Sequence, residues 1–93
     1  MKRVDLIFGE RELEQMLESL EKAEVPGYTV MKHVTGRGPE RVVSEDMDFT
    51  GLGANAHVIV FCDEKVLERI KDNAVPLLNY YGGVAYVSEA NSL

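Results

Sequence analysis

The sequence lacks tryptophan, contains a single cysteine and has no long apolar run. One cysteine cannot form an internal disulfide, whereas a small secreted domain usually has several. No apolar segment approaches the roughly 18 residues that span a membrane, and the first residues lack the apolar stretch of a signal peptide. These absences argue against a disulfide-bonded secreted scaffold and a membrane-inserted protein, and they predict a cytoplasmic location.

Positive charge is also scarce. The 10 Lys and Arg residues are outnumbered by 16 Asp and Glu, which gives a net charge of −6. Such a chain repels nucleic acid and anionic lipid, so we expect neither as a partner. A length of 93 residues with 45% hydrophobic composition predicts one folded domain over residues 1–93. A domain of this size has a thin core, and self-association would add to it.

In the first half of the chain, alternation over 2–8 predicts a strand with Val4, Leu6 and Phe8 on one face. The pattern then changes to a helical period over 10–24, and the glutamates of this segment are expected to be its solvated face. The apolar stripe of this helix is formed by Leu13, Met16, Leu17 and Leu20. Pro26 and Gly27 should stop the helix, with Gly27 supplying the reversed backbone. Aromatic and β-branched residues predict a second strand over 28–34.

In the second half, periodicity disappears over 36–53 and returns as a nearly continuous apolar strand over 56–62. A helix is expected over 64–73. Pro76, which follows this range, could kink the end of the helix or start a new turn. A last strand is expected over 84–88. The order predicts an α+β, ferredoxin-like βαββαβ fold, with a four-stranded antiparallel sheet and both helices on one face.

The sheet face without helices would carry several apolar residues. Such a surface is too apolar to leave in water, so self-association through the sheet is expected. The candidates for it are Ile7, Thr29, Met31, His57, Ile59 and Phe61.

Two glycine-bearing segments are candidates for ligand binding. Gly36, Arg37 and Gly38 could present backbone N–H groups beside one cation, which suits a phosphate or carboxylate; the alternative is a flexible loop base with an exposed Arg. The segment 79–83, Asn-Tyr-Tyr-Gly-Gly, offers aromatic faces and an open backbone; the alternative is a turn with two partly buried tyrosines.

The remaining polar residues suggest neither a metal centre nor catalysis. His33, His57 and Cys62 do not fall at a metal-ligand spacing, and alternation points His57 and Cys62 to opposite faces. No nucleophile–base arrangement or acid pair stands out, so we expect no enzyme activity. The acidic residues of the loop are Glu45, Asp46 and Asp48. A calcium loop needs a fuller set of alternating oxygen ligands than these three residues provide.

Three stretches together resemble PII signalling proteins. Residues 27–31, followed by 36–38 and a long loop, resemble the second strand and T-loop entrance of that family. Ala54-Asn55 resembles the T-loop exit, and residues 79–87 are similar to the B-loop and final strand of one branch. That branch contains carboxysome-associated PII-like proteins and the PII-like partner of a bicarbonate transporter.

The resemblance implies a homotrimer with an adenine nucleotide in each cleft between subunits, and a T-loop over about 36–53 that contacts a protein target. A bicarbonate transporter or a carboxysome-related component would be such a target, and bicarbonate would be a second regulatory ligand; no other cofactor is implied. By position, the nucleotide-binding residues would be Gly27, Tyr28, Thr29, Gly36, Arg37, Gly38, Arg41, Tyr80, Tyr81, Gly82 and Gly83.

The chain also departs from classical PII proteins. The loop after Thr35 contains no Tyr for uridylylation, the B-loop Lys is absent, and residues 89–93 contain no Lys or Arg. Since each phosphate charge needs a cationic partner, we expect AMP or ADP to be preferred over ATP.

The sequence leaves two alternatives to this function open. An ACT-type amino-acid regulatory module shares the order of elements but usually lacks the long central loop. A bare trimeric scaffold or a metal-tolerance protein of similar fold is the other.

Overall fold

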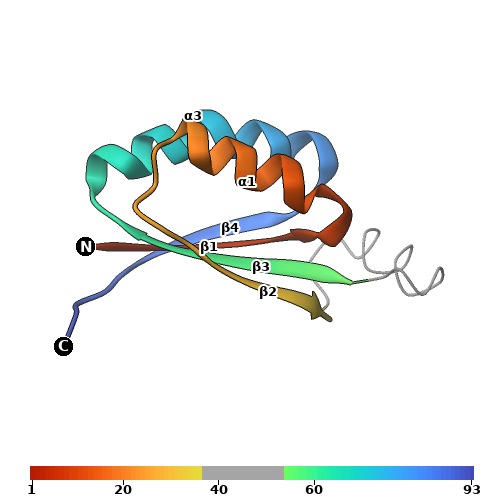
Figure 1. Cartoon of the computed structure of the whole chain (residues 1–93), viewed down its shortest axis with the longest axis horizontal. Coiled ribbons are helices and arrows are strands. Elements are labelled where there is room, and N and C mark those ends of the chain that lie inside the picture. The colour runs from red at the N-terminus through yellow and green to blue at the C-terminus, as the bar shows by residue number, and fades with distance from the viewer. Residues whose placement is uncertain (37–53) are drawn as a thin grey trace.

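The computed structural model describes residues 1–36 and 54–93, and these form one sheet covered by helices on one side (Figure 1). The four strands are antiparallel and lie in the order β2-β3-β1-β4. A short 3₁₀ turn, η1, follows β1, and the helices α1 and α3 pack on the same face (Figure 1). The bounds are β1 Lys2–Gly9, η1 Glu10–Glu12, α1 Leu13–Lys22, β2 Thr29–Val34, β3 Asn55–Cys62, α3 Glu64–Tyr81 and β4 Val84–Glu89. The predicted ferredoxin-like α+β fold is confirmed.

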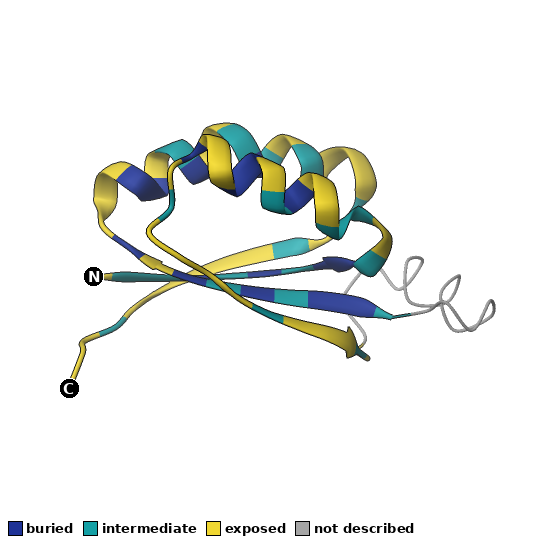
Figure 2. Ribbon diagram, in the orientation of Figure 1, coloured by how far each residue is buried: buried dark blue, intermediate teal, exposed yellow. Residues whose placement is uncertain are grey.

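The core lies between the central strands and the two helices, as Figure 2 shows by burial. Val4, Leu6 and Phe8 alternate along β1 toward the helices, as the sequence predicts. The apolar residues of α1 and α3 also face this core, because residues at three-and-four spacing share one side of a helix. The buried residues of the helices include Met16, Leu20, Val66, Leu67 and Ile70, with Leu13 and Leu17 partly buried beside them.

α1 differs from its predicted form at both ends. The segment begins as the 3₁₀ turn η1 and α1 ends at Lys22. The reversed backbone after it belongs to Glu24, at φ 58°, and Gly27 is not among the residues with positive φ. Val25 N–H donates to Leu20 O at 3.3 Å, which satisfies a carbonyl of the last turn. The prediction that Gly27 supplies this reversal was therefore wrong.

α3 runs to Tyr81 and contains Pro76, so the prediction that it ends near Asn73 was also wrong. Its start agrees with the sequence, since the Asp63 side chain accepts from Val66 N–H at 2.9 Å. A proline inside a helix costs about 3 kcal/mol, and fully burying a Leu side chain contributes about 1.5–3 kcal/mol. Burial of Leu78 in the turn beyond Pro76 offsets the lost hydrogen bond, so the helix continues.

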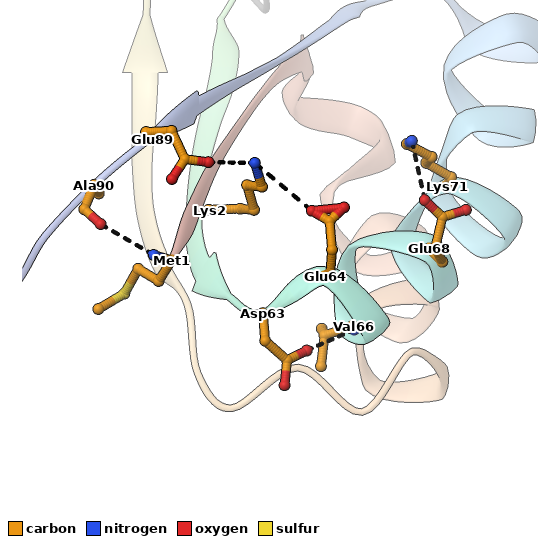
Figure 3. A network of polar contacts seen from close by, with 9 residues as sticks. All are labelled: Met1, Lys2, Asp63, Glu64, Val66, Glu68, Lys71, Glu89 and Ala90. Atoms are coloured by element: carbon orange, nitrogen blue, oxygen red, sulfur yellow. Dashed lines mark hydrogen bonds and ion pairs between the residues drawn. The ribbon is translucent and has the colours of Figure 1, made fainter.

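The start of β1 and the end of β4 are joined by polar contacts at one end of the sheet (Figure 3). The Lys2 ammonium pairs with Glu89 and lies 3.6 Å from Glu64 Oε1 at the start of α3. The hydrogen bond with Glu89 raises the pKa of Lys2 and lowers the pKa of Glu89. The Met1 ammonium donates to Ala90 O at 3.2 Å, and Ala90 N–H donates back to Met1 O at 3.0 Å. These contacts join β1, β4 and the start of α3 at the end of the sheet opposite Gly36 and Gly83.

Candidate functional site

The first of three segments that the resemblance assigns to nucleotide binding lies at the start of β2, where Gly27, Tyr28 and Thr29 are all exposed. A Cβ placed on Gly27 would meet no atom within 4 Å, and its φ is not positive. Nothing in this chain's own packing therefore requires glycine at position 27.

The second candidate segment begins where β2 ends. Val34 pairs with Asn55, so the strand that leads to Gly36 and the strand that follows Ala54 lie side by side at this corner. Gly36 is exposed, and a Cβ there would also meet no atom within 4 Å. Arg37, Gly38 and Arg41 lie outside the described residues, as does the rest of the predicted loop 36–53, including its acidic residues.

Glu10, in η1, makes contact with both sides of this corner. Its Oε1 accepts from His33 N–H at 2.9 Å, and its Oε2 lies 3.3 Å from His33 Nδ1. Its own backbone N–H donates to Ala54 O at 3.0 Å. The helical period over 10–24 predicted Glu10 on the solvated helix face. Its contacts depend on β2 and β3 and leave no local pattern in the sequence.

The third candidate segment is the corner between α3 and β4. Tyr80 and Tyr81 lie in the last turn of α3 and not in a loop before β4, because the helix continues past Pro76. Tyr80 is 81% exposed, and its ring meets that of Tyr81 edge-on at 4.7 Å between centroids. Tyr81 Oη accepts from Gln15 Nε2 at 3.3 Å, which fixes Tyr81 against α1 and leaves Tyr80 available for stacking.

The two glycines of this corner have a structural cause within the chain. Gly82, at φ 97°, ends α3, and its N–H donates to Leu78 O at 2.8 Å. Gly83 has φ 131°, and a Cβ on it would lie 2.8 Å from Ile7 O and 2.9 Å from Phe8 Cβ. Glycine is therefore required at both positions by the fold.

Within one chain, the β2 segments and the α3–β4 corner do not come together. β2 and β4 are the two edges of the sheet, with β3 and β1 between them. At about 4.8 Å between neighbouring strands, the two edges are about 14 Å apart. Gly36 and Gly83 lie toward the same end of the sheet, since Val34 pairs with Asn55, Asn55 with Gly9, and Val84 with Ile7. Two copies of the chain lying edge to edge would place these corners next to each other.

The sheet face opposite the helices carries the predicted apolar residues together with a polar cluster. The register aligns Thr29 with Ile59, and Met31 and Ile7 with His57. Phe61 and Tyr86, 45% and 59% exposed, continue the apolar surface on β3 and β4. The prediction of an uncovered apolar face is confirmed for the described residues.

The polar cluster consists of Arg3, Asp5 and His57. Arg3 Nη2 donates to Asp5 Oδ1 at 3.0 Å, and His57 Nε2 lies 2.8 Å from the same oxygen. The hydrogen bond from Arg3 lowers the pKa of Asp5, with a smaller contribution from His57, while burial opposes the shift. The i, i+2 spacing on one strand could have indicated the Arg3–Asp5 pair, whereas the contact with His57 depends on strand register.

Other reactive groups are placed away from these corners. Over residues 1–36 and 54–93, no three His, Cys, Asp or Glu side chains cluster closely enough to hold a metal ion. Cys62 is buried beneath the helices, on the face opposite His57, as alternation predicts. Burial raises the pKa of its thiol, with Asp63 and Glu64 adding to the shift, so the neutral form is favoured.

Comparison with solved structures agrees with the observed fold. CPII, a nitrogen regulatory PII-like protein from Thiomonas intermedia K12 bound to ADP, AMP and bicarbonate, is 22% identical, with a TM-score of 0.77 over 94% of this chain and 82% of that one. The same protein bound to ADP and bicarbonate is 23% identical, with a TM-score of 0.74 over 94% and 82%. A PII-like signalling protein from Thermus thermophilus is 23% identical, with a TM-score of 0.63 over 94% and 83%.

Sequence comparison identifies the family. No curated protein matches the chain. In the part of the chain that the structure describes, no helix has the length and apolarity to cross a membrane. The family model described as nitrogen regulatory protein P-II matches residues 1–93. Since this match extends over the entire sequence, the chain belongs to the nitrogen regulatory protein P-II family.

Proposed function

We propose that this protein is a homotrimeric PII-like sensor that binds an adenine nucleotide between subunits, with AMP or ADP preferred over ATP. The observation that carries the proposal is the placement of the candidate segments on opposite edges of one sheet. A site built from both edges is complete only where the β2 edge of one subunit meets the β4 edge of another. Membership in a family of regulatory proteins supports a sensor over an enzyme.

The open sheet face supports the assembly part of the proposal. A monomer would leave Phe61, Tyr86 and Met31 in water on this face. On this face they lie beside the Arg3–Asp5–His57 cluster, and burial of their apolar area would favour association, because apolar burial is its main driving force. Packing of the open faces around a common axis would cover these side chains and bring the strand edges of neighbouring subunits together.

The chemistry of the corners supports a nucleotide as the ligand. The exposed ring of Tyr80 can stack on an adenine base, and the space at Gly27 and Gly36 allows the ligand to approach the backbone. Phosphate oxygens would then be paired with Arg37, with Gly38 and Arg41 beside it in the sequence. On this proposal Thr29, Tyr28 and Tyr81 complete the lining, while Gly82 and Gly83 shape the corner that holds the tyrosines.

We further propose that bicarbonate is a second ligand and that the T-loop, residues 36–53, regulates a protein partner in inorganic-carbon metabolism in the cytoplasm. A bicarbonate transporter or a carboxysome component is the expected kind of partner. The structures of CPII with ADP and bicarbonate support the choice of ligands. Binding would act by selecting among conformations of the partner-binding surface, and no catalytic step is required.

Isothermal titration with AMP, ADP and ATP, each with and without bicarbonate, tests the ligand part of the proposal. Sizing by light scattering on the same sample tests the trimer. We expect a trimer that binds AMP or ADP more tightly than ATP. A monomer at micromolar concentration, or ATP as the tightest ligand by a wide margin, would contradict the proposal. Amino acids in a parallel thermal-shift panel test the ACT-type alternative, since only a true ligand raises the unfolding midpoint by mass action.

A further inference from the structure

Glu10 connects the two strands that border the candidate ligand corner. It is the first residue of η1, directly after β1, and therefore belongs to neither β2 nor β3. Its carboxylate contacts the backbone N–H and the ring of His33, and its backbone N–H contacts Ala54 O. Glu10 thus joins the end of β2, at His33, and the residue directly before β3, Ala54, to the end of the central strand β1.

The backbone at His33 needs such a contact. His33 has φ 58°, in the left-handed region that side chains rarely adopt, and the pairing of β2 with β3 is irregular between Met31 and Val34. An irregular strand end leaves backbone groups without ladder partners, and an unpaired N–H is costly unless another acceptor satisfies it. The carboxylate of Glu10 provides that acceptor at 2.9 Å.

The burial of the two side chains shows which one is held in place. The Glu10 side chain is 23% exposed, whereas the His33 side chain is 78% exposed. His33 therefore gains little from packing, and we infer that its conformation depends on the hydrogen bond from its backbone N–H to Glu10. A backbone held at a disfavoured angle by an outside group is typical of positions where geometry serves a function.

We propose that Glu10 is a positioning residue for the nucleotide site. By holding His33 in the left-handed conformation and Ala54 in place, it sets the direction in which the chain leaves β2 toward Gly36, and therefore the affinity for nucleotide. The inference rests on the proposed function, because the affinity that it predicts is that of the proposed ligand. It adds a residue that does not itself contact the ligand.

Three substitutions separate geometry from charge at this position. Glu10→Ala removes the acceptor. Glu10→Gln keeps an oxygen at the same reach and loses the charge, whereas Glu10→Asp keeps the charge and shortens the side chain by one methylene. Glu14→Ala, in the exposed first turn of α1, is the matched control. Each variant is titrated with ADP, and amide hydrogen exchange at His33 and Glu10 is followed by NMR.

We expect Glu10→Ala and Glu10→Asp to speed exchange of the His33 amide and to weaken ADP binding on the order of tenfold, a typical size for coupling between sites. Glu10→Gln should restore both properties, and Glu14→Ala should change neither. If Glu10 had a purely structural role, its substitution would lower the unfolding midpoint, and the Gln and Asp variants would not differ in His33 exchange and ADP affinity in this way.

Other outcomes overturn the inference. If exchange at His33 is unchanged in Glu10→Ala, or in Glu10→Asp should the alanine variant fail to fold, Glu10 does not hold the backbone. If exchange rises while ADP affinity is unchanged, Glu10 does not position the site. If the wild-type protein binds no adenine nucleotide, the proposed function fails and the positioning role toward that ligand fails with it. Exchange at His33 then still shows whether Glu10 holds the backbone.

Discussion

Replacing single glycines with alanine should separate the two kinds of glycine in the candidate site. Gly83→Ala adds one methyl group at a position that the fold encloses, and Gly27→Ala adds the same group where no atom lies within 4 Å. The pair is matched in chemistry and differs in the space around the new methyl group and in the backbone angle φ. Any difference in the free energy of unfolding therefore reports these two features of the fold.

The magnitude follows from the contacts. The new Cβ at position 83 would lie 2.8 Å from Ile7 O and from Leu78 Cδ2, closer than real Cβ atoms approach, at a φ of 131°. Overpacking costs about 1–3 kcal/mol and a disfavoured backbone conformation about 1–3 kcal/mol, so a loss of about 2–6 kcal/mol is expected. For a domain of this size that corresponds to a fall of about 8 °C or more in the unfolding midpoint.

Gly27→Ala should leave the unfolding free energy within about 0.5 kcal/mol of wild type, as expected at an open surface position. It should nevertheless weaken nucleotide binding, because the added methyl group occupies space assigned to the ligand. Thermal and urea denaturation at one protein concentration, followed by ADP titration, measure both effects. A midpoint for Gly83→Ala within about 2 °C of wild type, on the order of 0.5 kcal/mol or less, would refute the reasoning from the contacts.

Three further predictions concern other residues. Arg37→Ala should weaken nucleotide binding by roughly 1–3 kcal/mol if the side chain pairs with a phosphate, and an unchanged affinity in a titration would remove that role. Asp63→Ala removes the side-chain acceptor for Val66 N–H and should lower the free energy of unfolding by about 1 kcal/mol in urea denaturation; no change would mean that this cap is dispensable. The third prediction concerns pH. Because Arg3 and then His57 lower the pKa of Asp5, the stabilisation by this carboxylate is fully present above the ordinary Asp pKa of about 4 and is lost as pH falls through the lowered value. Stability measured from about pH 7 to pH 2 should therefore fall less steeply on the acid side in Asp5→Asn, and identical slopes would contradict this assignment.

The sequence by itself determined the order of elements and the residues that form the core. Alternation in β1 and helical spacing in α1 identified Leu6, Phe8, Met16 and Leu20 as inward-facing, because these periods are properties of the local backbone. The same alternation placed His57 and Cys62 on opposite faces of β3. Two candidate segments were also visible as glycines beside arginine or tyrosine.

Only the tertiary structure decided what those glycines are for. The sequence predicted a reversed backbone at Gly27 and an open turn at Gly83, yet Gly83 has the positive φ and is enclosed by β1 and α3, while Gly27 faces open space. The path of α3 through Pro76 and the contact of Glu10 with His33 likewise depend on packing between elements far apart along the chain. A local pattern carries no information about such contacts, because strand order and register determine which distant residues become neighbours.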